Sequence, residues 1–141
     1  MIKFKEDELI NNTTLLKEDN YITNIHMILE KQYVDTTDAE VKDFQEYSKE
    51  QKLPEGTTIK SFIKDCPPYE LKPLEEDNKE CCIFTANGTR IALGKSYYKR
   101  LSKIPHIKFY SDGGQYNPVC LVIHAGLMKK VIGCLMPCAQ A

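Results

Sequence analysis

The sequence predicts a β-rich α+β fold, a single domain over residues 1–141 with an antiparallel sheet and about two helices. Its 141 residues suit one ordinary domain with a real hydrophobic core. Most apolar residues occur in short runs bounded by Gly, Pro, Asn or Asp, which is the pattern of β-strands. Only two stretches carry apolar residues at helical spacing, so strands should outnumber helices.

Strands are expected on both sides of the middle of the chain. Residues 21–29 predict β structure with a kink or turn near Thr23-Asn24. Residues 81–86 and 89–93 flank Asn87-Gly88, the pair best suited to the positive φ angles of a type I′ hairpin turn. Three further strands should follow the second helix, over residues 106–110, 118–123 and 131–136.

The first helix is expected to begin after Thr37. The Thr37 hydroxyl would cap it, and Glu40 three positions later would complete a capping box. The helix should end near Gln51, before a proline and a glycine. Its apolar side would carry Val41, Phe44 and Tyr47.

The second helix is predicted over residues 95–104. Tyr97, Leu101 and Ile104 share one side, which should pack on the strands. Lys95, Lys99 and Lys103, spaced by four, fall on the opposite side and form a basic stripe.

Charge divides the chain more clearly than hydropathy does. Residues 1–80 hold nineteen acidic and eleven basic side chains, whereas residues 81–141 hold eight basic side chains and one acidic, Asp112. The proline-rich connection 65–80 closes the acidic half and precedes the basic half 81–141. A basic half with one carboxylate favours a phosphate-bearing partner or an acidic surface.

The basic stripe is the candidate binding site, because residues 81–141 hold too few acidic side chains to neutralise its lysines. Phosphate contacts there would be electrostatic and sensitive to salt. A solvated helix face is the alternative interpretation of the same stripe. The candidate nucleic-acid or phosphate-binding residues are Arg90, Lys95, Lys99, Arg100, Lys103 and Lys108.

The cysteines indicate a reducing, cytoplasmic environment with unpaired thiols. All six lie in or beside apolar runs, and the charged start over residues 1–6 lacks the apolar core of an export signal. The most apolar stretch, residues 118–137, is interrupted by His124 and by Lys129-Lys130, which are costly in hydrocarbon. It predicts two buried strands, so no membrane partner is expected.

Neither a catalytic site nor a cofactor or metal site is expected. Cys134 and Cys138 lack the second closely spaced pair that a zinc site needs. Cys120 and His124 are four apart on a predicted strand, about 13 Å, which is too far for direct proton transfer. The protein is therefore expected to act by binding and not as an enzyme.

Four segments of the basic half carry a family resemblance: residues 85–93 (Thr-Ala-Asn-Gly-Thr-Arg-Ile-Ala-Leu), 97–104, 118–123 and 132–137 (Ile-Gly-Cys-Leu-Met-Pro). They resemble the C-terminal half-module of bacterial and phage DNA sliding clamps. In that family a Thr-Asp-Gly-His-Arg-Leu-Ala type turn precedes a helix and three strands ending in Leu-Ile-Met-Pro. The likeness covers roughly the last 60 residues, and residues 22–27 echo the same turn, with Ile25 where Gly is expected.

The resemblance implies a clamp-module-like fold whose second helix faces DNA. A clamp ring contains six such domains, and this chain has at most one, so a ring would need several copies. Pairing of the oppositely charged halves of separate copies also favours a homo-oligomer. The alternative is a small phage-type interaction or inhibitor protein that binds a host protein or a small nucleotide signal.

Overall fold

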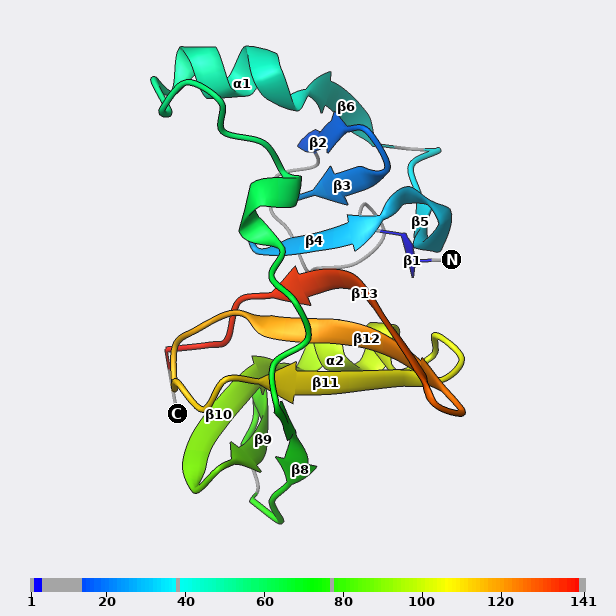
Figure 1. Cartoon of the computed structure of the whole chain (residues 1–141), viewed down its shortest axis with the longest axis vertical. Helices are drawn as coiled ribbons and strands as arrows, with labels where there is room; N and C mark the ends of the chain where they lie inside the picture. The colour runs from blue at the N-terminus through cyan, green and yellow to red at the C-terminus, as the bar shows by residue number, and fades with distance from the viewer. Residues whose placement is uncertain (1, 4–13, 38, 77, 140–141) are drawn as a thin grey trace. The chain divides into compact units, whose positions relative to one another are not determined.

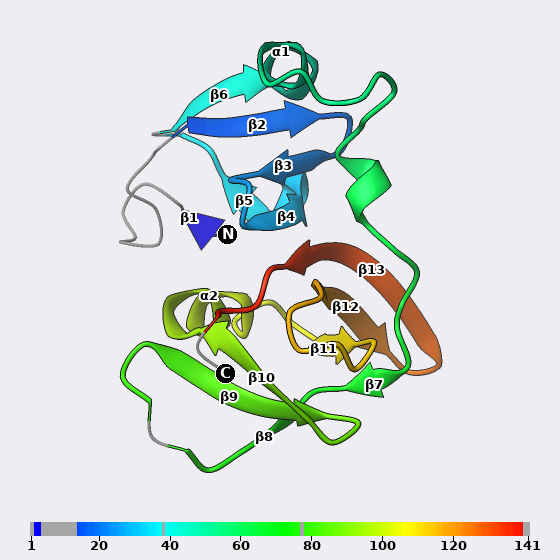
Figure 2. The same ribbon diagram turned by 90° about the vertical axis from the view of Figure 1, so that its left-hand side faces the viewer.

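The computed structural model describes residues 2–3, 14–37, 39–76 and 78–139. The chain forms two compact units, Met1–Lys64 (unit 1) and Asp65–Ala141 (unit 2), which are drawn from two sides in Figures 1 and 2. The division comes at the start of the proline-rich connection 65–80, which belongs to unit 2. Most of the charged start, residues 1–6, lies outside the described residues.

Unit 1 contains a sheet with the strand order β6-β2-β3-β4. Its strands are β2 (Thr14–Glu18), β3 (Tyr21–Thr23), β4 (Met27–Glu30) and β6 (Glu40–Asp43). A second pair joins β1 (Ile2–Lys3) to β5 (Val34–Asp35), and the 3-10 turn η1 (Lys31–Tyr33) connects β4 to β5.

The prediction of an antiparallel sheet holds only in part for unit 1, where the sheet is mixed. Strands β2, β3 and β4 alternate in direction, but β6 pairs with β2 in parallel, as β5 does with β1. The chain leaves β4 through η1 and β5 before β6, so β6 reaches the free edge of β2 by a crossover and not by a hairpin. The coarser prediction of a β-rich α+β fold with two α-helices is confirmed for the described residues.

Helix α1 (Phe44–Glu50) begins seven residues after Thr37, so the predicted capping box is wrong. Asp43 is the cap, and its carboxylate accepts a hydrogen bond from the Glu46 N–H at 3.4 Å. Glu40 pairs with β2 as part of strand β6, because strand pairing there outweighs the local preference for helix. The Thr37 hydroxyl donates to the Asp35 carboxylate instead.

The predicted end of this helix, near Gln51, is confirmed. Lys52 adopts a left-handed φ of 55°, and the Leu53 N–H donates to the Ser48 carbonyl at 3.0 Å. These are the features of a Schellman ending, which satisfies carbonyls that the last helical turn leaves open. The 3-10 turn η2 (Lys60–Phe62) follows before unit 1 ends.

Unit 2 contains two sheets, with the strand orders β13-β12-β11-β7 and β10-β9-β8. The connection 65–80 supplies the two-residue strands β7 (Tyr69–Glu70) and β8 (Lys72–Pro73). The predicted hairpin is confirmed as β9 (Cys81–Ala86) and β10 (Thr89–Gly94), with φ of 50° at Asn87 and 77° at Gly88. Helix α2 (Lys95–Leu101) follows directly.

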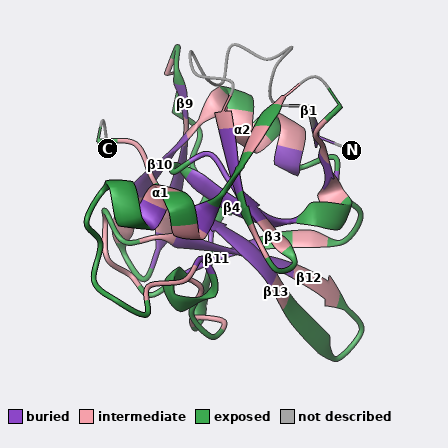
Figure 3. Cartoon of the chain, turned by 90° about the horizontal axis from the view of Figure 1, so that it is seen from above, coloured by how far each residue is buried: buried purple, intermediate pink, exposed green. Residues whose placement is uncertain are grey.

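The three predicted final strands are confirmed as β11 (Ile107–Ser111), β12 (Val119–Ala125) and β13 (Met128–Leu135). Strand β12 is the most buried of them, and Val119, Leu121 and Val122 are completely covered. No helix within the described residues is long and apolar enough to cross a membrane. Figure 3 shows the buried parts of these strands in purple and the β12–β13 turn in green.

The turn between β3 and β4 holds a β-branched residue in the left-handed region. Ile25 has a φ of 82° and is 61% exposed. The buried Asn24 accepts hydrogen bonds at its side-chain oxygen from the N–H groups of His26 (3.0 Å) and Met27 (2.8 Å). The Thr23 hydroxyl accepts from the Ile25 N–H (2.9 Å) and donates to the Met27 carbonyl (2.7 Å). These four hydrogen bonds hold the turn while Ile25 bears the strain.

Replacing Ile25 with Gly should raise the free energy of unfolding by about 1 kcal/mol, because Gly adopts positive φ without steric cost. Chemical denaturation measures the change. Ile63→Gly is the matched control, since Ile63 has an ordinary extended conformation (φ −97°, ψ 120°) and its replacement should lower the free energy of unfolding. Equal losses in both variants would contradict a strained turn.

Candidate functional site

Helix α2 is fixed to unit 2 by aromatic packing. The Tyr98 ring lies 5.0 Å from the Phe84 ring of β9 and 5.3 Å from the Phe109 ring of β11, measured between centroids. Leu101 is completely buried, and Ile104 just after the helix is 8% exposed. The predicted packed side of the helix is therefore confirmed at Leu101 and Ile104.

The outer side of α2 carries two exposed cations, Lys99 and Lys103. The helix ends at Leu101, three residues earlier than predicted, and Lys103 lies in a turn where its N–H donates to the Arg100 carbonyl at 3.2 Å. Neither lysine forms an ion pair with any described residue. We call Lys99 and Lys103 the outer lysines.

Two of the six predicted site residues are already engaged within unit 2. The Lys95 ammonium donates to the Asn78 carbonyl at 2.8 Å. Arg90 binds the Glu76 carboxylate with two nitrogens, including an Nε to Oε2 distance of 3.0 Å. The hydrogen bond from Arg90 lowers the pKa of Glu76, and the same bond raises the pKa of Arg90. Both cations thus fasten the connection 65–80 to β10 and α2.

Lys108 lies on β11 and not on α2, apart from the helix that carries Lys99. It is exposed and is one of the residues that line a pocket beside α2. Arg100 remains on α2, where it is half-buried. The predicted set of six therefore reduces to the outer lysines as the exposed cations of one surface.

Asp112, the one acidic residue after residue 80, is held within its own loop. Its carboxylate accepts hydrogen bonds from the Gly114 N–H at 2.8 Å and from the Asn117 amide at 3.0 Å. This loop is the predicted Ser-Asp-Gly-Gly turn after β11. The carboxylate is thus partnered within its loop by these two donors.

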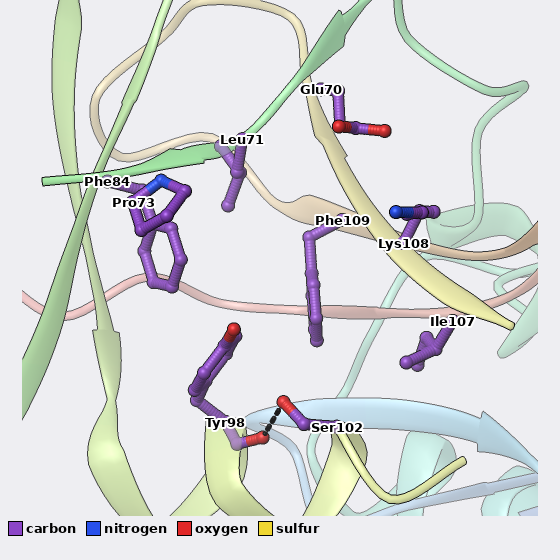
Figure 4. A pocket seen from close by; sticks show the side chains of 9 residues that line it. All are labelled: Glu70, Leu71, Pro73, Phe84, Tyr98, Ser102, Ile107, Lys108 and Phe109. Atoms are coloured by element: carbon purple, nitrogen blue, oxygen red, sulfur yellow. Dashed lines mark hydrogen bonds between the residues drawn. The ribbon is translucent and has the colours of Figure 1, made fainter. Parts of the chain in front are cut away.

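A pocket of about 320 Å³ opens beside α2 within unit 2 (Figure 4). Its lining mixes apolar and aromatic side chains with polar ones, and the sticks in Figure 4 show Phe109 and Tyr98 directed into it. The Ser102 hydroxyl at its edge donates to the Tyr98 carbonyl at 2.6 Å. The lining residues are Glu70, Leu71, Pro73, Phe84, Tyr98, Ser102, Ile107, Lys108 and Phe109. Sequence reasoning missed this pocket because five separate elements form it.

The cysteines are thiols, as predicted, and three of the six, Cys81, Cys120 and Cys134, are buried. Burial raises the pKa of Cys120 to about 12. Burial, followed by a hydrogen bond with Cys81, raises the pKa of Cys138 to about 12. No group of three or more potential metal ligands occurs among the residues that the structure describes. Because their pKa values are raised, the thiols of Cys120 and Cys138 are protonated at neutral pH and weakly nucleophilic.

The β12–β13 hairpin holds exposed residues that sequence reasoning did not select. Residues 125–130 are all exposed, and they include Leu127 and Met128 next to two lysines. The prediction left residues 124–130 between two strands, whereas β12 and β13 join through a two-residue turn at Gly126-Leu127. Gly126, between two runs of strand-forming residues, was the feature of the sequence that could have indicated this turn.

Comparison of the chain with family models, curated proteins and solved structures gave no match. The sliding-clamp resemblance therefore stays a prediction.

The raised thiol pKa values predict slow alkylation of the folded protein. At pH 8, iodoacetamide should modify Cys120 and Cys138 at least about tenfold more slowly in the folded than in the unfolded chain. Peptide mass spectrometry gives the rates, and equal rates in both states would contradict the prediction.

The free energy of unfolding should also fall as the pH rises from about 9 toward 12, because unfolded thiols ionise there while these two stay protonated.

Proposed function

We propose that unit 2 is a DNA-binding module and that the protein acts by binding and not by chemistry. The observation that carries this proposal is the pair of outer lysines, Lys99 and Lys103, which are exposed and lack ion pairs among the described residues. They are four residues apart along one side of α2 and its following turn, which suits contact with neighbouring phosphates of one strand. The resulting affinity would be electrostatic and largely independent of base sequence.

The surrounding charge supports the same proposal. Residues 81–141 contain eight basic residues and only Asp112 as an acid, and its carboxylate is hydrogen-bonded within its own loop. A helix face that is merely solvated usually mixes both signs of charge. The element order over residues 81–135, a hairpin, a helix and three strands, is also the order expected of a sliding-clamp half-module.

A second candidate is the alternative expected from the sequence, a phage-type protein that binds a host protein or a small nucleotide signal. The pocket beside α2 favours it, because Phe84, Tyr98 and Phe109 form an aromatic group with Lys108 also in the lining. An aromatic group with a nearby cation suits a nucleobase and its phosphate.

Charge reversal at the outer lysines should weaken DNA binding by at least about tenfold. The measurement is fluorescence anisotropy with a labelled duplex at about 50 and about 200 mM salt, where loss of two phosphate contacts should also reduce the salt slope by about 1.8. Lys99→Glu with Lys103→Glu is the test variant. Lys49→Glu with Lys60→Glu, two exposed lysines of unit 1, gives the same charge change as a control. Unchanged binding in the test variant would contradict the proposal.

The pocket is tested with a fluorescent dinucleotide in the same assay. If it is a nucleotide site, Lys108→Glu should weaken dinucleotide binding by at least about tenfold, because the exposed Lys108 supplies the phosphate contact in the pocket. Lys99→Glu with Lys103→Glu should leave that binding intact. Absence of dinucleotide binding to the unchanged protein would reject this second candidate.

A further inference from the structure

The tip of the β12–β13 hairpin presents two large apolar side chains to solvent. Leu127 is fully exposed and Met128 is 75% exposed. Gly126, with a φ of 61°, and Leu127 form the two-residue turn, which matches a type II′ hairpin. This turn geometry needs the glycine but places no demand for an apolar residue at position 127. Adjacent exposed apolar residues on a projecting turn are typical of an interaction site.

Strand register places part of this tip on the same side as α2. Phe109 faces α2, and Ile107, two residues earlier, shares that side. Ile107 pairs with Ile123, and Ile123 pairs with Lys130. Met128, two residues before Lys130, therefore also lies on the α2 side.

The opposite side of the hairpin is occupied differently. His124 pairs with Lys129, and the Lys129 ammonium lies 4.7 Å from the centre of the Tyr110 ring. The Tyr110 hydroxyl is 3.5 Å from the Nδ1 atom of His124. Lys129 thus lies against the sheet on this side, and Met128 belongs to the side that carries α2.

The hairpin and the end of α2 also lie at the same end of the sheet. The His124 N–H, at the base of the hairpin, donates to the His106 carbonyl at 2.9 Å. His106 follows the outer lysine Lys103 by three residues. Figure 1 shows the turn after α2 and the β12–β13 turn at this common end. An apolar tip therefore adjoins one end of the basic surface.

We propose that the hairpin tip is a DNA wedge, in which Leu127 and Met128 enter the minor groove and separate one base step. Lys103 contacts a phosphate beside that step. Leu and Met are residue types that architectural proteins insert between base steps, and flanking cations hold the bent backbone. This inference rests on the proposed DNA binding by the outer lysines.

Charge favours DNA over a lipid surface as the occupant. Only two apolar side chains are exposed at the tip, and they lie at the end of a basic surface that continues along α2 to Lys99. A duplex offers a groove for the tip and a row of phosphates for the lysines.

The test measures DNA bending separately from DNA binding. A duplex of about 25 base pairs with a central TA step, which kinks easily, carries a donor and an acceptor dye at its ends. The unchanged protein should increase energy transfer on saturation. Leu127→Ser with Met128→Ser should abolish the increase while weakening the affinity by no more than about tenfold. Leu74→Ser with Met136→Ser, a matched pair of exposed residues, should bend DNA normally.

The outcomes separate this inference from the proposed function. Saturable binding of the unchanged protein with no change in energy transfer would overturn the wedge and leave DNA binding by α2 in place. No binding at all would overturn both. Vesicles containing phosphatidylserine form a second arm: if the protein binds them, loses that binding in Leu127→Ser with Met128→Ser, and does not bend DNA, the tip is a lipid contact and the wedge is wrong.

Discussion

The ring of Tyr98, packed against Phe84 of β9 and Phe109 of β11, connects helix α2 to both sheets of unit 2. Aromatic pairs of this kind stabilise by about 0.5–1.5 kcal/mol each beyond the area they bury. Together with the buried Leu101, this contact sets the rotation of α2 about its axis. Lys99 must then point to solvent, because it follows Tyr98 by one residue, about 100° around the helix. The exposure of Lys99 is thus a consequence of how Tyr98 and Leu101 pack in the core.

Two kinds of cation occur in the basic half, and their surroundings explain the difference. Arg90 and Lys95 have partners within reach, the Glu76 carboxylate and the Asn78 carbonyl, both supplied by the connection 65–80. The outer lysines have no such partner among the described residues. The connection 65–80 therefore engages Arg90 and Lys95, whereas the outer lysines remain for an external ligand.

The sequence predicted the structural features that depend only on residues close to one another in the chain. The hairpin at Asn87-Gly88 needs only its own turn. The spacing also indicated the packed side of α2 at Leu101 and Ile104, although it selected Tyr97 where Tyr98 makes the aromatic contacts. The first helix was placed too early because residues 40–43 pair with β2, more than twenty positions away, which no local pattern reports. The ion pair of Arg90 with Glu76 and the place of Lys108 in the pocket lining depend on tertiary contacts in the same way.

The most direct test of the account is an NMR titration of the isotope-labelled 16.2 kDa chain with duplex DNA, following each backbone amide. The account predicts that the largest shifts occur along α2 and its following turn, at Lys99 and Lys103, and at the hairpin turn 126–128. The amides of α1 should not move. Shifts confined to α1, or to the pocket residues 70–73 with α2 unchanged, would contradict the claim that α2 carries the DNA-binding surface.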